Sequence, residues 1–122
     1  MSTALREDAL QRTADGVELA IGLPWIRSLA LNCVLGLEVL IDGEPVESVC
    51  ALVDGRLVEL AALAEEPGWW FLQDRLRLAA PGSPAPGEHR VEVAMELLIP
   101  YLSAGGERPL IVPIRLSEHL KV

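Results

Sequence analysis

The chain has 122 residues, of which 51% are hydrophobic and 23% charged, a composition typical of one folded domain and not of a disordered protein. Its formal net charge of -8 argues against nucleic acid and anionic membranes as partners, because both would repel it. The longest uncharged stretches, 28–37 and 97–106, are far shorter than the roughly 20 residues that a membrane-spanning helix requires.

The first fifteen residues are expected to form an N-terminal arm. They mix basic and acidic side chains without period-2 alternation, so this segment could be a short helix or a loose extension. Charged residues occupy positions 6–8, where the apolar part of a secretory signal would begin, and we therefore expect a cytoplasmic protein. The folded domain is expected to span residues 16–122.

Alternating apolar and polar residues predict a series of short strands in this domain. The expected strands are 17–23, 35–41, 49–53, 57–60, 76–78, 89–100 and 110–116. Asp-Gly pairs and a Pro/Gly-rich stretch at 81–87 supply the turns. Residues 59–66, closed by a Pro-Gly pair, predict the only helix, a short one. These patterns favour an all-β fold: a single antiparallel β-sandwich of immunoglobulin-like or similar topology.

Three large apolar residues interrupt the polar side of the predicted strands. Leu40, Leu98 and Ile111 each lie opposite the core-facing set of their strand. They could be isolated apolar residues of the kind that ordinary protein surfaces carry. They could also mark a sheet face or edge that another subunit covers.

The sequence offers no constellation of catalytic or metal-binding residues. His89 and His119 are the only histidines, and neither lies in a zinc-binding or nucleophile motif. We expect a structural role for His89 and an exposed position for His119. Cys33 and Cys50 lie in apolar runs without a second cysteine nearby, which favours buried thiols over a disulfide or a metal site.

An aromatic run, Trp69-Trp70-Phe71, follows the predicted helix. Such a run can plug the end of a sandwich or lie at a contact between subunits. Carboxylates lie close to it in the sequence: Glu65, Glu66 and Asp74. Aromatic rings beside carboxylates can also bind a sugar, so ligand stacking is the alternative.

Several segments together resemble a known family. The motif Pro24-Trp25-Ile26-Arg27-Ser28-Leu29 follows the first predicted strand, and a strand ending in Asp-Gly follows the motif. The segments 69–74, 86–93 and 100–101 come later in the chain. The order of these segments resembles that in the beta subunits of bacterial C-glycoside deglycosidases. The first motif is similar to the family's Pro-aromatic-aromatic-Arg-Ser-Leu run, and segment 69–74 is similar to its Trp-Phe-x-x-Asp element. Segment 86–93 is similar to its Pro-Gly-x-His-x-Val element, and Tyr101 lies where the family has its closing aromatic residue.

The resemblance implies a non-catalytic subunit of a heteromeric carbon-carbon lyase. A larger alpha subunit, a TIM barrel related to sugar isomerases, would hold the catalytic base and a divalent metal ion of the manganese or magnesium type. Oxidation at the 3-position of the sugar would acidify the 2-proton, and its removal would expel the carbon-linked plant phenol by elimination. The small subunit alone would be inactive.

The resemblance and the aromatic run together predict an interface with that larger subunit. The predicted interface residues are Pro24, Trp25, Ile26, Arg27, Ser28, Trp69, Trp70, Phe71 and Tyr101. Arg27 could bind a partner carboxylate, reach the mouth of the partner's active site, or be solvated. A free-standing β-sandwich module that binds carbohydrate or protein is the alternative function, and an enzyme in its own right is a third.

Overall fold

The computed structural model describes residues 4–25, 27–82, 84–105 and 108–122, with side chains described for all of these except 102–105 and 108. The strands are β1 (Leu10–Thr13), β2 (Gly16–Gly22), β3 (Leu29–Ala30), β4 (Val34–Ile41), β5 (Glu44–Pro45), β6 (Cys50–Val53), β7 (Arg56–Glu59), β8 (Trp69–Trp70), β9 (Arg75–Ala80), β10 (Glu88–Gly105) and β11 (Arg108–Lys121). Two short 3-10 helices accompany them, η1 (Leu31–Cys33) and η2 (Leu60–Glu65).

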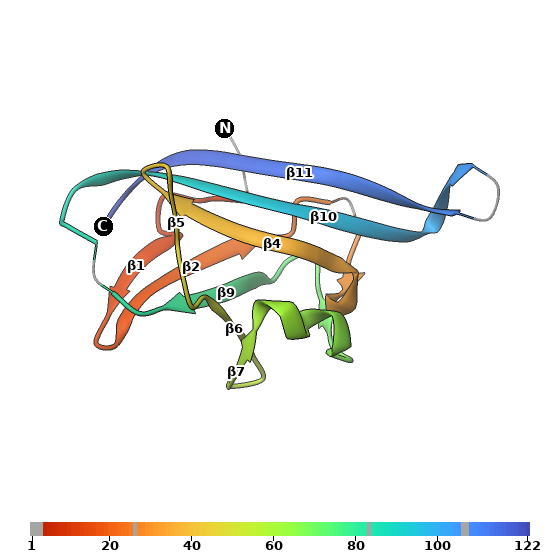
Figure 1. Cartoon of the computed structure of the whole chain (residues 1–122), viewed down its shortest axis with the longest axis horizontal. Helices are drawn as coiled ribbons and strands as arrows, with labels where there is room; N and C mark the ends of the chain where they lie inside the picture. Colours follow the sequence, from red (N-terminus) through yellow and green to blue (C-terminus); the bar gives the residue numbers. More distant parts are fainter. Residues whose placement is uncertain (1–3, 26, 83, 106–107) are drawn as a thin grey trace.

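Two antiparallel sheets face each other across one apolar core (Figure 1). One sheet has the order β1-β2-β9-β6-β7, the other has the order β11-β10-β4-β5, and β3 pairs with β8 in a separate ladder. The core face of β10 is almost fully buried and consists of Val91, Val93, Met95, Leu97 and Ile99. The predicted all-β sandwich is therefore confirmed, and each predicted strand corresponds to a strand of the structure.

The two Asp-Gly pairs form the tight turns that the sequence predicts. Asp42 and Gly43 have φ values of 53° and 83°, and Asp54 and Gly55 have values of 50° and 77°. Two successive residues in the left-handed region match the twist of the flanking strands, and Asp-Gly tolerates this conformation well. These turns fix the register of the β4–β5 and β6–β7 hairpins.

The N-terminal segment differs from the expected arm. Its described part packs on the sandwich: β1 pairs with β2, and Leu5, Ala9 and Leu10 belong to the core. The alternation of a half-buried strand is missing because only Leu10 of β1 points inward, while the other three residues of the strand are exposed. The predicted helix at 59–66 is the 3-10 helix η2, and η1 is a second one that the sequence patterns do not indicate.

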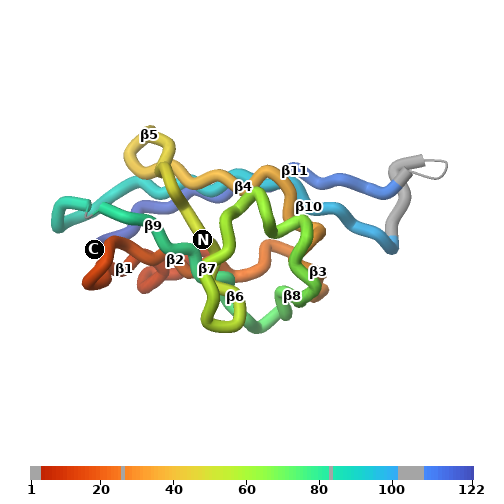
Figure 2. Tube along the Cα trace, turned by 60° about the horizontal axis from the view of Figure 1, so that its bottom comes forward, coloured from red at the N-terminus to blue at the C-terminus, as the bar shows by residue number. Residues whose placement is uncertain are grey.

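A long two-stranded ribbon extends beyond the body of the sandwich. β4 pairs with β10 only between Val91 and Leu97, whereas β10 and β11 stay paired well past that point (Figure 1). Ile99 pairs with Leu110 and Ser103 with Pro109, so residues 100–102 of β10 are unpaired and form a three-residue bulge. Bulges bend a strand and redirect its side chains, and this one lies beyond the last residue of β10 that pairs with β4. Figure 2 shows the ribbon extending past β3 and β8.

None of the helices in the described part of the chain is long and apolar enough to cross a membrane.

Candidate partner interface

Three segments that are distant in the sequence meet at one end of the sandwich. They are the loop between β2 and β3, the short strand β8 with the turn after it, and the bulge of β10. β3 pairs with β8 through Leu29 and Trp70. The Ser28 hydroxyl accepts a hydrogen bond of 2.7 Å from the backbone N–H of Leu72. The first two segments are therefore held together by backbone and side-chain bonds.

Tyr101 joins the third segment to the first. The indole Nε1–H of Trp25 donates a hydrogen bond of 2.6 Å to the Tyr101 hydroxyl, 76 positions further along the chain. The guanidinium carbon of Arg27 lies 5.3 Å from the centre of the Tyr101 ring, a distance at which a cation is attracted to the ring face. Within the described part of the chain, Arg27 has no carboxylate partner. Its charge is therefore available to a group outside the chain.

The aromatic run presents alternate rings to opposite sides, as residues of a strand must. Trp69, Phe71 and Leu72 expose 57%, 49% and 47% of their surface, and Tyr101 exposes 44%. Trp70 exposes only 2%, and its Nε1–H donates to the backbone carbonyl of Asp74. Trp70 is therefore a core residue. The prediction that it contacts a partner is corrected, because its buried ring can only support the exposed side chains beside it.

We define the aromatic end as Trp25, Arg27, Ser28, Trp69, Phe71, Leu72 and Tyr101. Trp25 and Ser28 are half-buried, as is the neighbouring Pro24, and Arg27 is exposed. Ile26, also a predicted interface residue, lies outside the described residues. All five aromatic residues of the chain lie in the three segments that meet here. Sequence reasoning missed Leu72, although its position directly after the aromatic run is a signal that could have included it.

The apolar residues on the outer sheet face lie where the sequence places them. Leu40 and Leu98 are half-buried, and Ile111 is 45% exposed. Leu98 and Ile111 are directly opposite each other on β10 and β11, near the base of the ribbon. Leu40 lies opposite Glu92, further along the sheet. Leu98 and Ile111 thus form a small apolar pair near the ribbon, whereas Leu40 is isolated from them.

The histidines lie beside acidic or carbonyl groups of the chain, and the cysteines are unpaired. The His89 ring lies between the Asp42 carboxylate and the Ala85 carbonyl, with both N···O distances at 2.6 Å. The exposed ring of His119 lies 3.3 Å from Glu88. Both cysteines are free thiols, Cys33 buried and Cys50 half-buried. Among the described residues, no three His, Cys, Asp or Glu side chains are grouped so that they could hold a metal ion.

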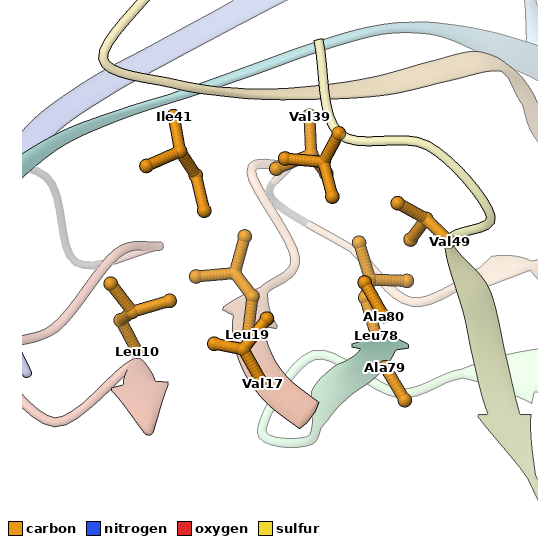
Figure 3. Close-up of a pocket in the computed structure, with 10 residues that line it drawn as sticks. Leu10, Val17, Leu19, Val39, Ile41, Val49, Leu78, Ala79 and Ala80 are labelled. Atoms are coloured by element: carbon orange, nitrogen blue, oxygen red, sulfur yellow. The ribbon is translucent and has the colours of Figure 1, made fainter. Parts of the chain in front are cut away.

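Two hollows differ sharply in character. The first lies between the sheets at the end opposite β8, is lined only by apolar side chains such as Leu10, Leu19 and Val39, and has a volume of about 20 Å³ (Figure 3). A cavity of this size and polarity is a dry packing gap and not a ligand site. The second is a groove of about 190 Å³ beside Trp69, with charged side chains in its wall.

Comparison with known proteins gives two similar chains. Over 116 residues the sequence is 30% identical to the 3'-dehydrocarminate deglycosidase beta subunit of a Microbacterium species, a match that covers 92% of this chain and 84% of that protein. Over 104 residues it is 32% identical to the C-glycoside deglycosidase beta subunit of Microbacterium trichothecenolyticum, with 80% and 78% of the two chains covered. No protein-family model matches the chain.

Proposed function

Because this chain belongs to the family of C-glycoside deglycosidase beta subunits, we propose that it is the accessory subunit of a heteromeric enzyme that cleaves the carbon-carbon bond of C-glycosides. The names of both relatives, which designate beta subunits, support assembly with a second kind of subunit. In this proposal the chain supplies a rigid docking surface, and the reacting groups belong to the partner.

The aromatic end is the observation that supports the proposal best. Exposed aromatic rings beside an arginine are the residue types enriched at the centre of protein interfaces. The hydrogen bond from Trp25 to Tyr101 and the pairing of β3 with β8 hold these groups in place before any partner arrives. A preorganised surface loses less conformational entropy on binding than a loose one.

The partner in this proposal is a larger, metal-dependent subunit of the sugar-isomerase-like barrel type. It would hold the divalent metal ion and the base that removes the 2-proton of a 3-oxo-C-glucoside, and the phenolic group would leave by elimination. The beta subunit would act by stabilising this partner and shaping its surroundings. Its expected cytoplasmic location belongs to the same proposal.

Replacement of Arg27 tests the interface. A hydrogen bond to a charged group contributes roughly 1.5–3 kcal/mol, so Arg27→Ala should raise the dissociation constant of the complex by about tenfold or more. Arg115, an exposed arginine in the middle of β11, provides the matched control variant Arg115→Ala. Size-exclusion chromatography of the co-expressed subunits measures assembly. If Arg27→Ala assembles as well as the wild type, Arg27 does not contribute to the interface.

Turnover measurements test the division of labour between the subunits. A 3-oxo-C-glucoside should be cleaved by the co-expressed pair and not by this chain alone. Cleavage by this chain alone would contradict its assignment as an accessory subunit. A monomer that neither binds nor activates the larger subunit would favour the alternative, a free-standing module that binds carbohydrate or protein.

A further inference from the structure

The groove beside Trp69 has the features of a site for a neutral sugar. Its lining residues include parts of β8, of the turn that joins β6 to β7, and of the start of β9. We propose that this groove binds one pyranose unit of an uncharged carbohydrate. The inference goes beyond the proposed function, because it assigns to this chain a ligand of its own.

An exposed tryptophan and two acidic residues line the groove. Trp69 is one of the lining residues and leaves 57% of its surface exposed. Asp54 and Asp74, both exposed, also line the groove. Neither carboxylate has a hydrogen bond or ion pair with another described residue, although Arg56 lies near Asp54. A pyranose has an apolar C–H face, which can stack on an indole ring, and hydroxyl groups, which can donate to carboxylates.

The charges around the groove argue against an anionic ligand. Arg75 and Arg77 line it, but their guanidinium groups are already paired, Arg75 with Asp8 at 2.8 Å and Arg77 with Glu18 at 3.4 Å. The uncompensated charges are therefore those of the two carboxylates. An anion would be repelled by them, and a purely apolar ligand would desolvate them without replacing their hydrogen bonds.

The size of the groove limits the ligand to a single ring. Its volume of about 190 Å³ lies below the roughly 300–1,000 Å³ of pockets for drug-sized molecules. The lining includes Leu31 and Trp70, which are buried core residues, so the packing of the sandwich contributes to the shape of the groove. A site formed by rigid elements does not need to be ordered by its ligand.

Ligand-observed NMR on the full chain tests the proposal. The probes are the methyl pyranosides of glucose, galactose and mannose, with sorbitol as an acyclic polyol and glucuronate as an anion. At least one pyranoside should show saturable binding with a millimolar dissociation constant, and sorbitol and glucuronate should not. Absence of saturable binding for all three pyranosides, or equal binding of sorbitol or glucuronate, would overturn the proposal.

Variants locate the binding. Trp69→Ala should abolish it, Trp69→Phe should retain part of it, and Asp74→Ala should weaken it about tenfold, since hydrogen bonds to charged groups are among the stronger ones. Both side chains, Trp69 and Asp74, are exposed, and unchanged thermal unfolding verifies that the three variants fold. Binding that is unaffected by both Trp69→Ala and Asp74→Ala would place the sugar elsewhere and refute the assignment.

A second pair of variants separates this inference from the proposed interface. Phe71 and Arg27 belong to the aromatic end but do not line the groove. Phe71→Ala and Arg27→Ala should weaken assembly with the larger subunit and leave sugar binding by the free chain unchanged. Asp74→Ala should weaken sugar binding by the free chain and leave assembly with the larger subunit unchanged. Each proposal can therefore fail while the other holds.

Discussion

His89 occupies a position in which both ring nitrogens face acceptors. Nδ1 lies 2.6 Å from the Asp42 carboxylate, and Nε2 lies 2.6 Å from the carbonyl of Ala85. Only the doubly protonated ring can donate to both. The Ala85 carbonyl and then the Asp42 carboxylate raise the pKa of His89. The His89 ring and then the backbone N–H of Arg90 lower the pKa of Asp42. This contact ties the Pro/Gly-rich loop to the turn after β4.

The stability of the protein should therefore depend on the charge of His89. A raised pKa in the folded state means that this contribution is complete below the unfolded pKa of about 6.5 and is lost as the pH rises through the folded value. The contribution of Asp42 is complete above about pH 3.9 and is lost as the pH falls through its lowered pKa. Urea unfolding of the wild type at pH 6 and pH 9 should show a decrease that is smaller in His89→Gln.

The exposed His119 supplies the control for this measurement. His119→Gln should retain the decrease between pH 6 and pH 9 that His89→Gln diminishes. An equal decrease in wild type and His89→Gln would show that the contact does not contribute to stability over this range.

At the scale of elements, the β1–β2 hairpin depends on a close backbone approach. Gly16 is the first residue of β2, and a Cβ atom built there would collide with the carbonyl oxygen of Ala80 and lie 3.0 Å from the Cα of Pro81. Because both neighbours are backbone atoms, a side chain at this position could be accepted only if β2 and β9 moved apart. The paired registers of β2 with β1 and with β9 oppose such a movement.

Gly16→Ala should consequently lower the free energy of unfolding by about 1–3 kcal/mol, the usual cost of overpacking. Gly36 provides the comparison, because its φ is 57° but nothing lies within 4 Å of a Cβ built there. Gly36→Ala should incur only the left-handed backbone penalty of roughly 1–2 kcal/mol. Chemical denaturation measures both changes. A Gly16→Ala variant as stable as the wild type would mean that the strands separate easily.

Local patterns in the sequence predict the long strands, whereas pairing between distant segments determines the rest. The alternation in β10 suffices to identify its buried face, because one side of that strand is apolar throughout. β3 and β8 have only two residues each, too few for any periodicity, and they exist because they pair with each other. Most residues of the aromatic end, though not Leu72, could be predicted from the sequence. Its assembly could not, because the bulge that lets Tyr101 reach Trp25 depends on the register between β10 and β11.

At the scale of the whole molecule, the exposed apolar side chains are unevenly distributed. Among the residues whose side chains the structure describes, six large apolar residues are exposed, and four of them belong to the aromatic end, namely Trp69, Phe71, Leu72 and Tyr101. Leu57 and Ile111 are the other two, and Leu57 lies on β7 beside a hollow that includes Thr13 and Pro81. Contiguous exposed apolar residues typically mark an interaction site, whereas isolated ones do not. The asymmetry gives the free chain one surface on which association is favoured.

The free chain should therefore bind an uncharged hydrophobic dye such as Nile red, and assembly with the proposed partner subunit should suppress the signal. Phe71→Ser combined with Leu72→Ser should lower the dye fluorescence of the free chain several-fold, because these side chains together present an apolar surface next to Trp69. Leu57→Ser is the matched control: Leu57 is 65% exposed, more than either of the others, but lies away from the aromatic end. Equal losses in both variants would mean that the dye reports total apolar exposure, and that the aromatic end is not a distinct docking surface.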